Sequence, residues 1–161
     1  MHIGPSPSVA SSVLKRQRLL SDEMVCVVRE DHPALGRGGG RRLPKLSLET
    51  YTGLGHIMVG VGKRGPTTVD RELAERGTRR RIVCRVPHFV AALTIVGETD
   101  LVLTVPRRLA ARLGRGHGLT LCRTPLSKMP FQYAQFWSPI YHADPGHRWF
   151  RAQALSAARR A

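Results

Sequence analysis

The sequence predicts an α/β fold in which helices cover a largely parallel sheet. Strand-like and helix-like segments alternate along the 161 residues, a pattern typical of βα units. Residues 24–28, MVCVV, form an uninterrupted apolar run of strand length, which indicates a central strand buried on both faces. Residues 67–77 begin with threonine and end with glycine, as a well-delimited helix does. A chain of this length fits one domain or two small lobes.

The elements of the first half follow from their boundaries. A very short strand at residues 2–3 gives way to a loop rich in glycine and proline, and the strand at 24–28 ends at Asp31-His32-Pro33, because proline cannot donate to a sheet ladder. Residues 36–42, with three successive glycines, are predicted as a basic surface loop, since no phosphate-binding glycine motif is present. A helical turn at 47–51 and a strand at 56–59 follow.

The second half continues the alternation. A glycine-rich turn at 60–66 leads into a helix whose N-cap is Thr67 or Thr68 and whose stop is Gly77. Prolines open the next helices, and Asp144 with Pro145 opens the last one. The remaining elements are expected as a strand at 82–86, a helix at 88–96, a strand at 101–105, a helix at 106–113, strands at 119–122 and 131–137, and a helix at 146–158.

Composition limits the function classes. The longest apolar stretch, residues 89–96, has about eight residues against the roughly 20 needed to span a bilayer. The N-terminus lacks the pattern of a secretory signal, so we expect a cytoplasmic protein without membrane contact. Cys26, Cys84 and Cys122 lie far apart and are expected as buried free thiols. No metal, catalytic or cofactor motif is present, so we expect no metal, no cofactor and no enzymatic activity.

The net charge of +15 taken by itself would suggest a nucleic-acid partner. The basic residues are, however, scattered over several segments, which favours solvated basic faces and leaves direct binding of nucleic acid as an alternative. They include Arg37, Arg41, Arg42, Lys45, Arg79, Arg80, Arg81, Arg107, Arg108, Arg112, Arg115, Arg159 and Arg160.

Three segments resemble the effector domain of LysR-type transcription regulators. Residues 20–33, LSDEMVCVVREDHP, are similar to the stretch where the family's chain crosses between two lobes. Residues 85–92, RVPHFVAA, and 99–109, TDLVLTVPRRL, resemble the family's helix and following strand. Residues 136–139, FWSP, and 142–149, HADPGHRW, resemble its return strand and closing helix.

The resemblance implies a type 2 periplasmic-binding-protein fold, with a small effector held between two α/β lobes. Residues 1–26 and 129–161 would form an incomplete first lobe and residues 27–128 the second. Family members carry an N-terminal helix-turn-helix domain, which is absent from this sequence, so DNA would be contacted only through that absent domain. The resemblance does not decide whether Met1 is the native start.

Effector contacts are expected after the strands of the second lobe. By resemblance, Gly60, Val61, Gly62 and Lys63 are the expected contacts in the first of these loops, where glycines allow close approach and a following helix N-terminus favours an anion. An ordinary βα turn is the alternative.

A second group of contacts is expected at the next two strands. By resemblance, His88 and Phe89 at the start of the helix after Pro87 would face the cleft, and Thr104 and Pro106 lie at the end of the following strand, the usual ligand edge of an open α/β sheet. Helix capping for His88 and core packing for Phe89 are the alternatives. Trp137, Trp149 and Phe150 are expected in the core rather than in a binding surface.

Three functions remain open. The first is an effector-sensing domain for a small, aromatic or anionic molecule, acting within an oligomer. The second is a truncated interaction protein that associates with intact LysR-type regulators through unpaired strand edges. The third is non-specific, salt-sensitive binding of nucleic acid.

Overall fold

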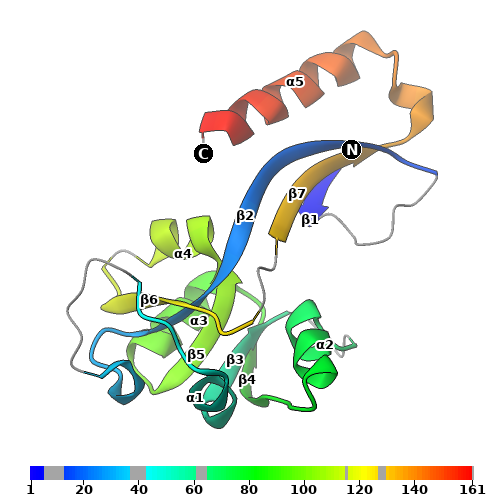
Figure 1. Ribbon diagram of the computed structural model, residues 1–161. Coiled ribbons are helices and arrows are strands. Elements are labelled where there is room, and N and C mark those ends of the chain that lie inside the picture. Colours follow the sequence, from blue (N-terminus) through cyan, green and yellow to red (C-terminus); the bar gives the residue numbers. More distant parts are fainter. Residues whose placement is uncertain (6–12, 37–42, 61–64, 115, 127–129, 161) are drawn as a thin grey trace. The chain divides into compact units, whose positions relative to one another are not determined.

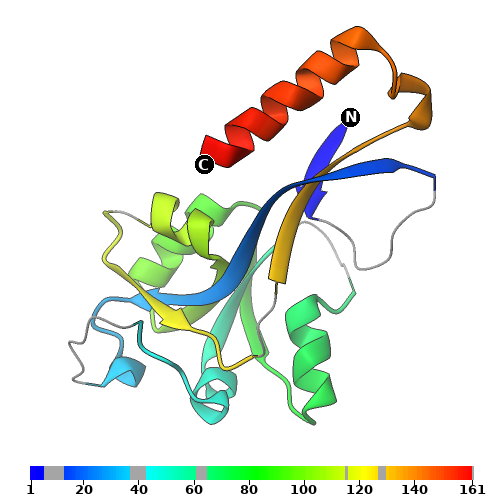
Figure 2. The same ribbon diagram turned by 45° about the horizontal axis from the view of Figure 1, so that its top comes forward.

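The computed structural model describes residues 1–5, 13–36, 43–60, 65–114, 116–126 and 130–160, with the side chains of residues 130 and 131 left aside. The chain divides into two compact units, Met1–Glu23 with Pro130–Ala161 (unit 1) and Met24–Met129 (unit 2). Figures 1 and 2 show the elements of each unit. The fold class is α/β, as predicted. The assignment of units 1 and 2 to the first and second lobes stays a proposal.

Unit 2 is built on a mixed sheet. Strand β3 (Gly55–Val59) lies between β4 (Arg81–Val86) and β5 (Leu101–Pro106) and is parallel to both. The later half of β2 (Lys15–Arg29) pairs antiparallel with β5 and with β6 (Leu119–Arg123). Among the described strands parallel pairing is thus confined to β3 and its two neighbours, so the sheet is less parallel than the βα alternation predicted.

Helices cover both faces of this sheet. Those of one face are α1 (Leu48–Gly53) and α2 (Thr68–Glu75), and those of the other are α3 (Phe89–Gly97) and α4 (Arg107–Leu113) (Figure 1). Along β2, Cys26 and Val28 pack into the cluster under α1 and α2, while Val25 and Val27 pack into the other. The apolar run at 24–28 is buried on both faces because alternate side chains of a strand point to opposite sides. A short 3-10 helix, η1 (Pro33–Leu35), follows β2 at the predicted stop.

The helix boundaries in unit 2 follow their capping residues. Thr67 is the N-cap of α2, and its side chain and that of Asp70 form a reciprocal capping box. Gly77 follows the helix with a φ of 68°, a conformation that glycine adopts without strain. The predicted alternatives for the cap are therefore resolved in favour of Thr67.

Unit 1 joins the two ends of the chain in one small sheet. Strand β7 (Pro130–Trp137) pairs antiparallel with β1 (His2–Pro5) and with the first half of β2. The 3-10 helix η2 (Pro139–Tyr141) leads to α5 (Pro145–Arg160). Asp144 accepts a hydrogen bond from the His147 N–H at 2.6 Å, as expected of a helix cap.

An arginine takes the central inward position of α5. Arg151 is 8% exposed, and its guanidinium lies 4.5 Å from the ring centre of Trp137. It donates to the carbonyls of Tyr141 at 3.1 Å and His142 at 2.8 Å. Such a buried cation is tolerated because its donors are satisfied and its plane stacks on an aromatic face.

The prediction that all three large aromatic residues of this region lie in the core is wrong for two of them. Trp137 is buried, but Trp149 is 64% exposed and Phe150 53% exposed. Arg151 is the buried residue of α5 in the described part of the chain, and residues 147, 154, 155, 156 and 158 are half-buried; most of these form one stripe at helical spacing, and the exposed residues 149 and 150 lie off it.

Candidate functional site

The carboxyl ends of the parallel strands of unit 2 meet at one edge of the sheet. Val59 pairs with Val86, and Ile57 with Leu103, so β3, β4 and β5 end at the same level. The Gly60 N–H donates to the Val86 carbonyl at 2.9 Å and ties the first residue after β3 to the end of β4. In open α/β sheets this edge is where ligands bind.

Five of the predicted contacts lie at this edge in the described residues. Gly60 follows β3, His88 and Phe89 follow β4, and Thr104 and Pro106 end β5. Val61, Gly62 and Lys63 lie outside the described residues.

These five residues differ in how free they are to meet a ligand. His88 is exposed and is the N-cap of α3, yet its side chain makes no capping hydrogen bond, so the capping alternative does not hold. Phe89 packs against the cluster under α3 and α4, which agrees with its core alternative. A side chain at Gly60 would have nothing within 4 Å, so open space lies beside it. Pro106 is buried and precedes α4.

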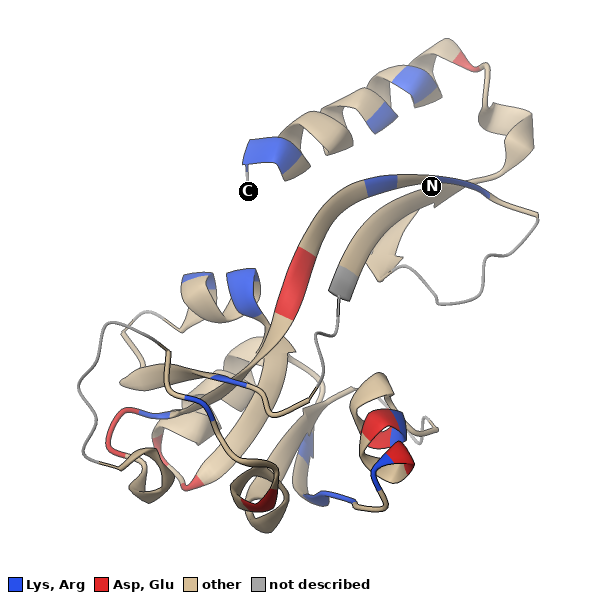
Figure 3. Ribbon diagram, in the orientation of Figure 1, with Lys and Arg blue, Asp and Glu red and all other residues tan. Residues whose placement is uncertain are grey.

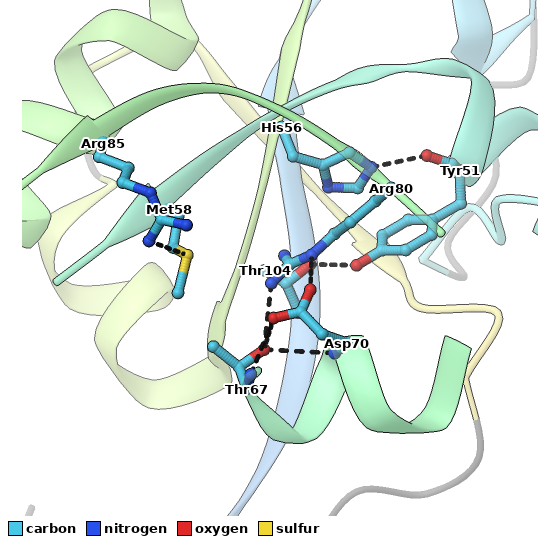
Figure 4. Close-up of polar contacts among 8 residues, drawn as sticks. All are labelled: Tyr51, His56, Met58, Thr67, Asp70, Arg80, Arg85 and Thr104. Carbon is cyan, nitrogen blue, oxygen red and sulfur yellow. Dashed lines mark hydrogen bonds and ion pairs between the residues drawn. The ribbon is translucent and has the colours of Figure 1, made fainter. Parts of the chain in front are cut away.

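Thr104 belongs to a polar cluster inside unit 2 (Figure 4). Its hydroxyl is 2.8 Å from the Tyr51 hydroxyl, which reaches it from α1. Burial raises the pKa of Tyr51 to about 12, so the phenol stays protonated. The half-buried Thr104 hydroxyl is thus already paired in the absence of a ligand.

A buried ion pair forms the second part of this cluster. Arg80, with a side chain 5% exposed, donates from Nε to Asp70 Oδ1 at 2.8 Å and from Nη2 to Thr67 Oγ1 at 3.1 Å (Figure 4). Burial would raise the pKa of the Asp70 carboxyl, but hydrogen bonds from Arg80 and Thr67 outweigh it and lower that pKa to about 2. The sequence predicted Thr67 as one of two possible N-caps, but the contacts of its hydroxyl with Asp70 and Arg80 were not predicted.

His56 lies at the centre of the cluster and is fully buried. Its Nε2 is 2.8 Å from the Tyr51 carbonyl, which only accepts, so Nε2 carries the proton. Its ring meets the Tyr51 ring edge-on at 4.6 Å between centroids. Burial lowers the pKa of His56 to about 4, which keeps the imidazole neutral at physiological pH.

Two buried cysteines also lie in unit 2. Burial raises the pKa of the Cys26 thiol to about 12 and that of Cys122 to about 11, so neither is a ready nucleophile. Within the described residues no group of three or more histidine, cysteine or acidic side chains is placed to hold a metal ion. In the same part of the chain no helix combines the length and apolarity of a membrane span.

Comparison with known proteins decides the family. The model of the LysR substrate binding domain matches residues 3–159. The chain belongs to this family. Within it, the sequence is 34% identical over 149 residues to the transcriptional activator NagR of a Ralstonia species and 35% identical over 149 residues to the activator NahR of Pseudomonas putida.

Each of these two matches covers 92% of this LysR-type chain and 47% of the relative, so the chain spans about half the length of the curated relatives it matches. A solved structure of a probable transcriptional regulator from Pseudomonas aeruginosa superposes with a TM-score of 0.79 at 28% identity, covering 94% of this chain and 48% of that one. The predicted resemblance and its fold are confirmed.

Proposed function

We propose that this LysR effector-binding chain senses a small molecule and controls a DNA-bound oligomeric regulator. The observation that carries the proposal is the family match over residues 3–159, since the family's domain is one that binds a small molecule. We place the regulator in the cytoplasm and its contact with DNA in a domain outside these residues. A ligand controls such a protein by preferring one of two conformations.

The effector contacts of unit 2 are proposed at the carboxyl edge of its parallel strands. They are Gly60, Val61, Gly62, Lys63, His88, Phe89, Thr104 and Pro106. Gly60 and His88 are the strongest of those in the described residues, because one leaves open space beside it and the other has an exposed ring at the N-terminus of α3. The Thr104 hydroxyl is already hydrogen-bonded to the Tyr51 hydroxyl, so it would contact an effector by accepting a hydrogen bond with its remaining lone pair.

An anionic or aromatic effector fits this edge. The first turn of α3 has no side-chain cap and no acidic residue, so its N–H groups and positive dipole end are open to an anion. By contrast, Thr67 already caps the N-terminus of α2, and the Asp70 carboxylate accepts a hydrogen bond from the Thr67 N–H. This shifts the expected anion contact from α2, favoured by the sequence, to α3 and Lys63.

Thermal unfolding with a panel of single-ring aromatic carboxylates tests the proposal. A binder at about 100 times its Kd should stabilise the protein by about 2.7 kcal/mol. The variant His88→Ala should weaken that effect, while His117→Ala, in the turn before β6, should retain it. A panel without any stabilising compound, or an equal loss in both variants, contradicts the assignment of this edge.

The interaction function stays a second candidate because unit 1 exposes apolar residues. Ile140 is 80% exposed, in addition to Trp149 and Phe150. Exposed apolar surface of this kind favours association with another protein, here a second copy or an intact LysR-type regulator. In sedimentation, Trp149→Ser with Phe150→Ser should reduce self-association, while Val90→Ser, an exposed apolar residue of unit 2, should not. A concentration-independent monomer before mutation contradicts self-association.

A further inference from the structure

A basic pocket opens at the other end of the parallel strands from the proposed effector contacts. It has a volume of about 380 Å³ and is lined by Thr52 of α1 and by three successive arginines, Arg79, Arg80 and Arg81. Arg81 is the first residue of β4, whereas the effector contacts follow its last residue. A six-residue strand separates the two places by roughly 17 Å. The pocket is therefore a separate feature of unit 2.

Of the three arginines in this pocket, one is paired with a carboxylate of the described residues and two are not. Arg80 lines the pocket, and its guanidinium is paired with Asp70 at 2.8 Å. Arg79 and Arg81 are exposed, and in the described part of the chain neither forms an ion pair with an acidic side chain. Figure 3 shows the basic run between the end of α2 and β4. Among the described residues, the positive charges of Arg79 and Arg81 therefore have no acidic side chain paired with them.

One acidic residue lies nearby in sequence on the facing helix. Glu49 precedes Thr52 by one turn of α1, but it joins no ion pair in the described residues. The Thr52 hydroxyl donates its proton to the Leu48 carbonyl at 2.9 Å. Thr52 therefore lines the pocket without offering a hydrogen-bond donor to a ligand. Donors for a ligand therefore come from the arginines.

Gly55 lies beside one of these donors. A Cβ at this residue would stand 2.7 Å from Leu101 Cδ2, and 3.5 Å from Arg81 Nη2, which is an ordinary van der Waals distance. The Arg81 guanidinium therefore lies next to the backbone of β3, although the residue is exposed.

We propose that this pocket binds a phosphate group, carried by free phosphate or by a phosphomonoester, between Arg79 and Arg81. A guanidinium donates two parallel N–H groups to an oxyanion, and two such forks provide the charge that a dianion requires. The concave shape favours a small ligand over the backbone of a duplex, which needs a row of contacts along a surface. The inference goes beyond the effector function and does not depend on it.

Titration of the intact chain with inorganic phosphate, followed by amide NMR at constant ionic strength, tests the site. Saturable shifts are expected at residues 52 and 79–81. Arg79→Gln with Arg81→Gln should weaken binding by about tenfold or more, because both forks are lost. Arg159→Gln with Arg160→Gln removes the same charge from the end of α5 and should change the affinity by less than about twofold. All four of these arginines are exposed, so both double variants should fold. If Arg79→Gln with Arg81→Gln does not fold, the two single variants replace it.

Four outcomes would overturn the proposal. The first is a linear, non-saturating response to phosphate, and the second is an equal loss in the two double variants, which indicates a general charge effect. The third is equal affinity for acetate, which would make the pocket a carboxylate site. Methyl phosphate as a second probe separates the two sources, since a phosphomonoester site binds it at least as tightly as inorganic phosphate. The fourth is tight binding of a short DNA duplex that Arg79→Gln with Arg81→Gln abolishes, which would reject the assignment to a small ligand.

Discussion

At the scale of single side chains, buried polar residues in unit 2 lie close to one of the proposed effector contacts, Thr104. Thr104 was predicted as an effector contact from its place at the end of a strand, and the structure adds that Tyr51 holds its hydroxyl. Arg80, His56 and Asp70 were not predicted, because only the tertiary fold brings residues of α1, α2, β3 and the start of β4 together. Their roles depend on long-range contacts that local sequence patterns do not encode.

Replacing one partner of the buried ion pair should destabilise unit 2. Asp70→Asn leaves the Arg80 guanidinium, 5% exposed, without its counter-charge, and we expect a loss of about 2–3 kcal/mol in the free energy of unfolding. The matched change Glu98→Gln, at an exposed residue, should cost less than about 0.5 kcal/mol. Urea denaturation at pH 7 measures both. Equal effects of the two variants would contradict the role given to the pair.

The pH dependence of stability should report the buried imidazole. His56 has a pKa of about 4 in the folded chain, below the value of about 6.5 for an unfolded chain. The stabilisation is therefore fully present above pH 6.5 and is lost as the pH falls toward 4, because only the unfolded chain takes up the proton in that range. The loss amounts to about 3 kcal/mol.

His56→Gln should remove this part of the pH dependence. Urea midpoints between pH 7.5 and 4.5 should therefore converge for the two proteins as the pH falls. Parallel curves for wild type and variant would show that the pKa of His56 is the same in the folded and the unfolded chain, which contradicts the prediction.

At the scale of elements, most strand segments and helix caps were predictable from the sequence, but the pairing of the strands in the sheets was not. The apolar run at 24–28, the Thr67 cap and the Asp144 cap signal local preferences that the fold keeps. The sequence did not reveal that β2 extends from Lys15 to Arg29, because its first half, KRQRLLSD, has too little apolar alternation to resemble a strand. Antiparallel pairing of that half with β7 joins segments more than a hundred residues apart.

Helix α5 shows the same limit. Trp149 and Phe150 were placed in the core because large aromatic residues usually lie there, but the inward stripe runs through Arg151. A hydrophobicity pattern cannot select an arginine as a core residue. The backbone carbonyls and the Trp137 ring that surround its guanidinium make that position favourable.

Two variants of α5 should therefore change the free energy of unfolding in the reverse order to the hydrophobicity of the residues replaced: the arginine should matter more than the tryptophan. Arg151→Gln leaves the Tyr141 and His142 carbonyls without their donor and should cost about 2–3 kcal/mol of unfolding free energy. Trp149→Ser changes an exposed residue and should cost no more than about 0.5 kcal/mol. Urea unfolding followed by circular dichroism gives both values. A greater loss for the tryptophan variant would place residue 149 in a core.

At the scale of the whole molecule, the fold and family were predictable because three separated segments each resembled the same family, in the same order. The contacts proposed for the effector could be placed only in part. Gly60 and His88 lie at the carboxyl edge of the parallel strands, while the loop residues Val61, Gly62 and Lys63 lie outside the described residues. Which ligand they meet depends on side-chain chemistry that a shared fold does not determine.

Hydrogen exchange measured by mass spectrometry on the native polypeptide, with and without a compound that raises its melting temperature, tests the central claim most directly. Binding at the carboxyl edge of the parallel strands should slow exchange in peptides that cover residues 60–66, 87–92 and 104–108, because closure around a ligand protects these backbone amides. Peptides at 79–83, at the opposite end of β4, should be unchanged by that compound. Protection that spares all three edge segments while the compound still binds would contradict the assignment of this edge as the effector site.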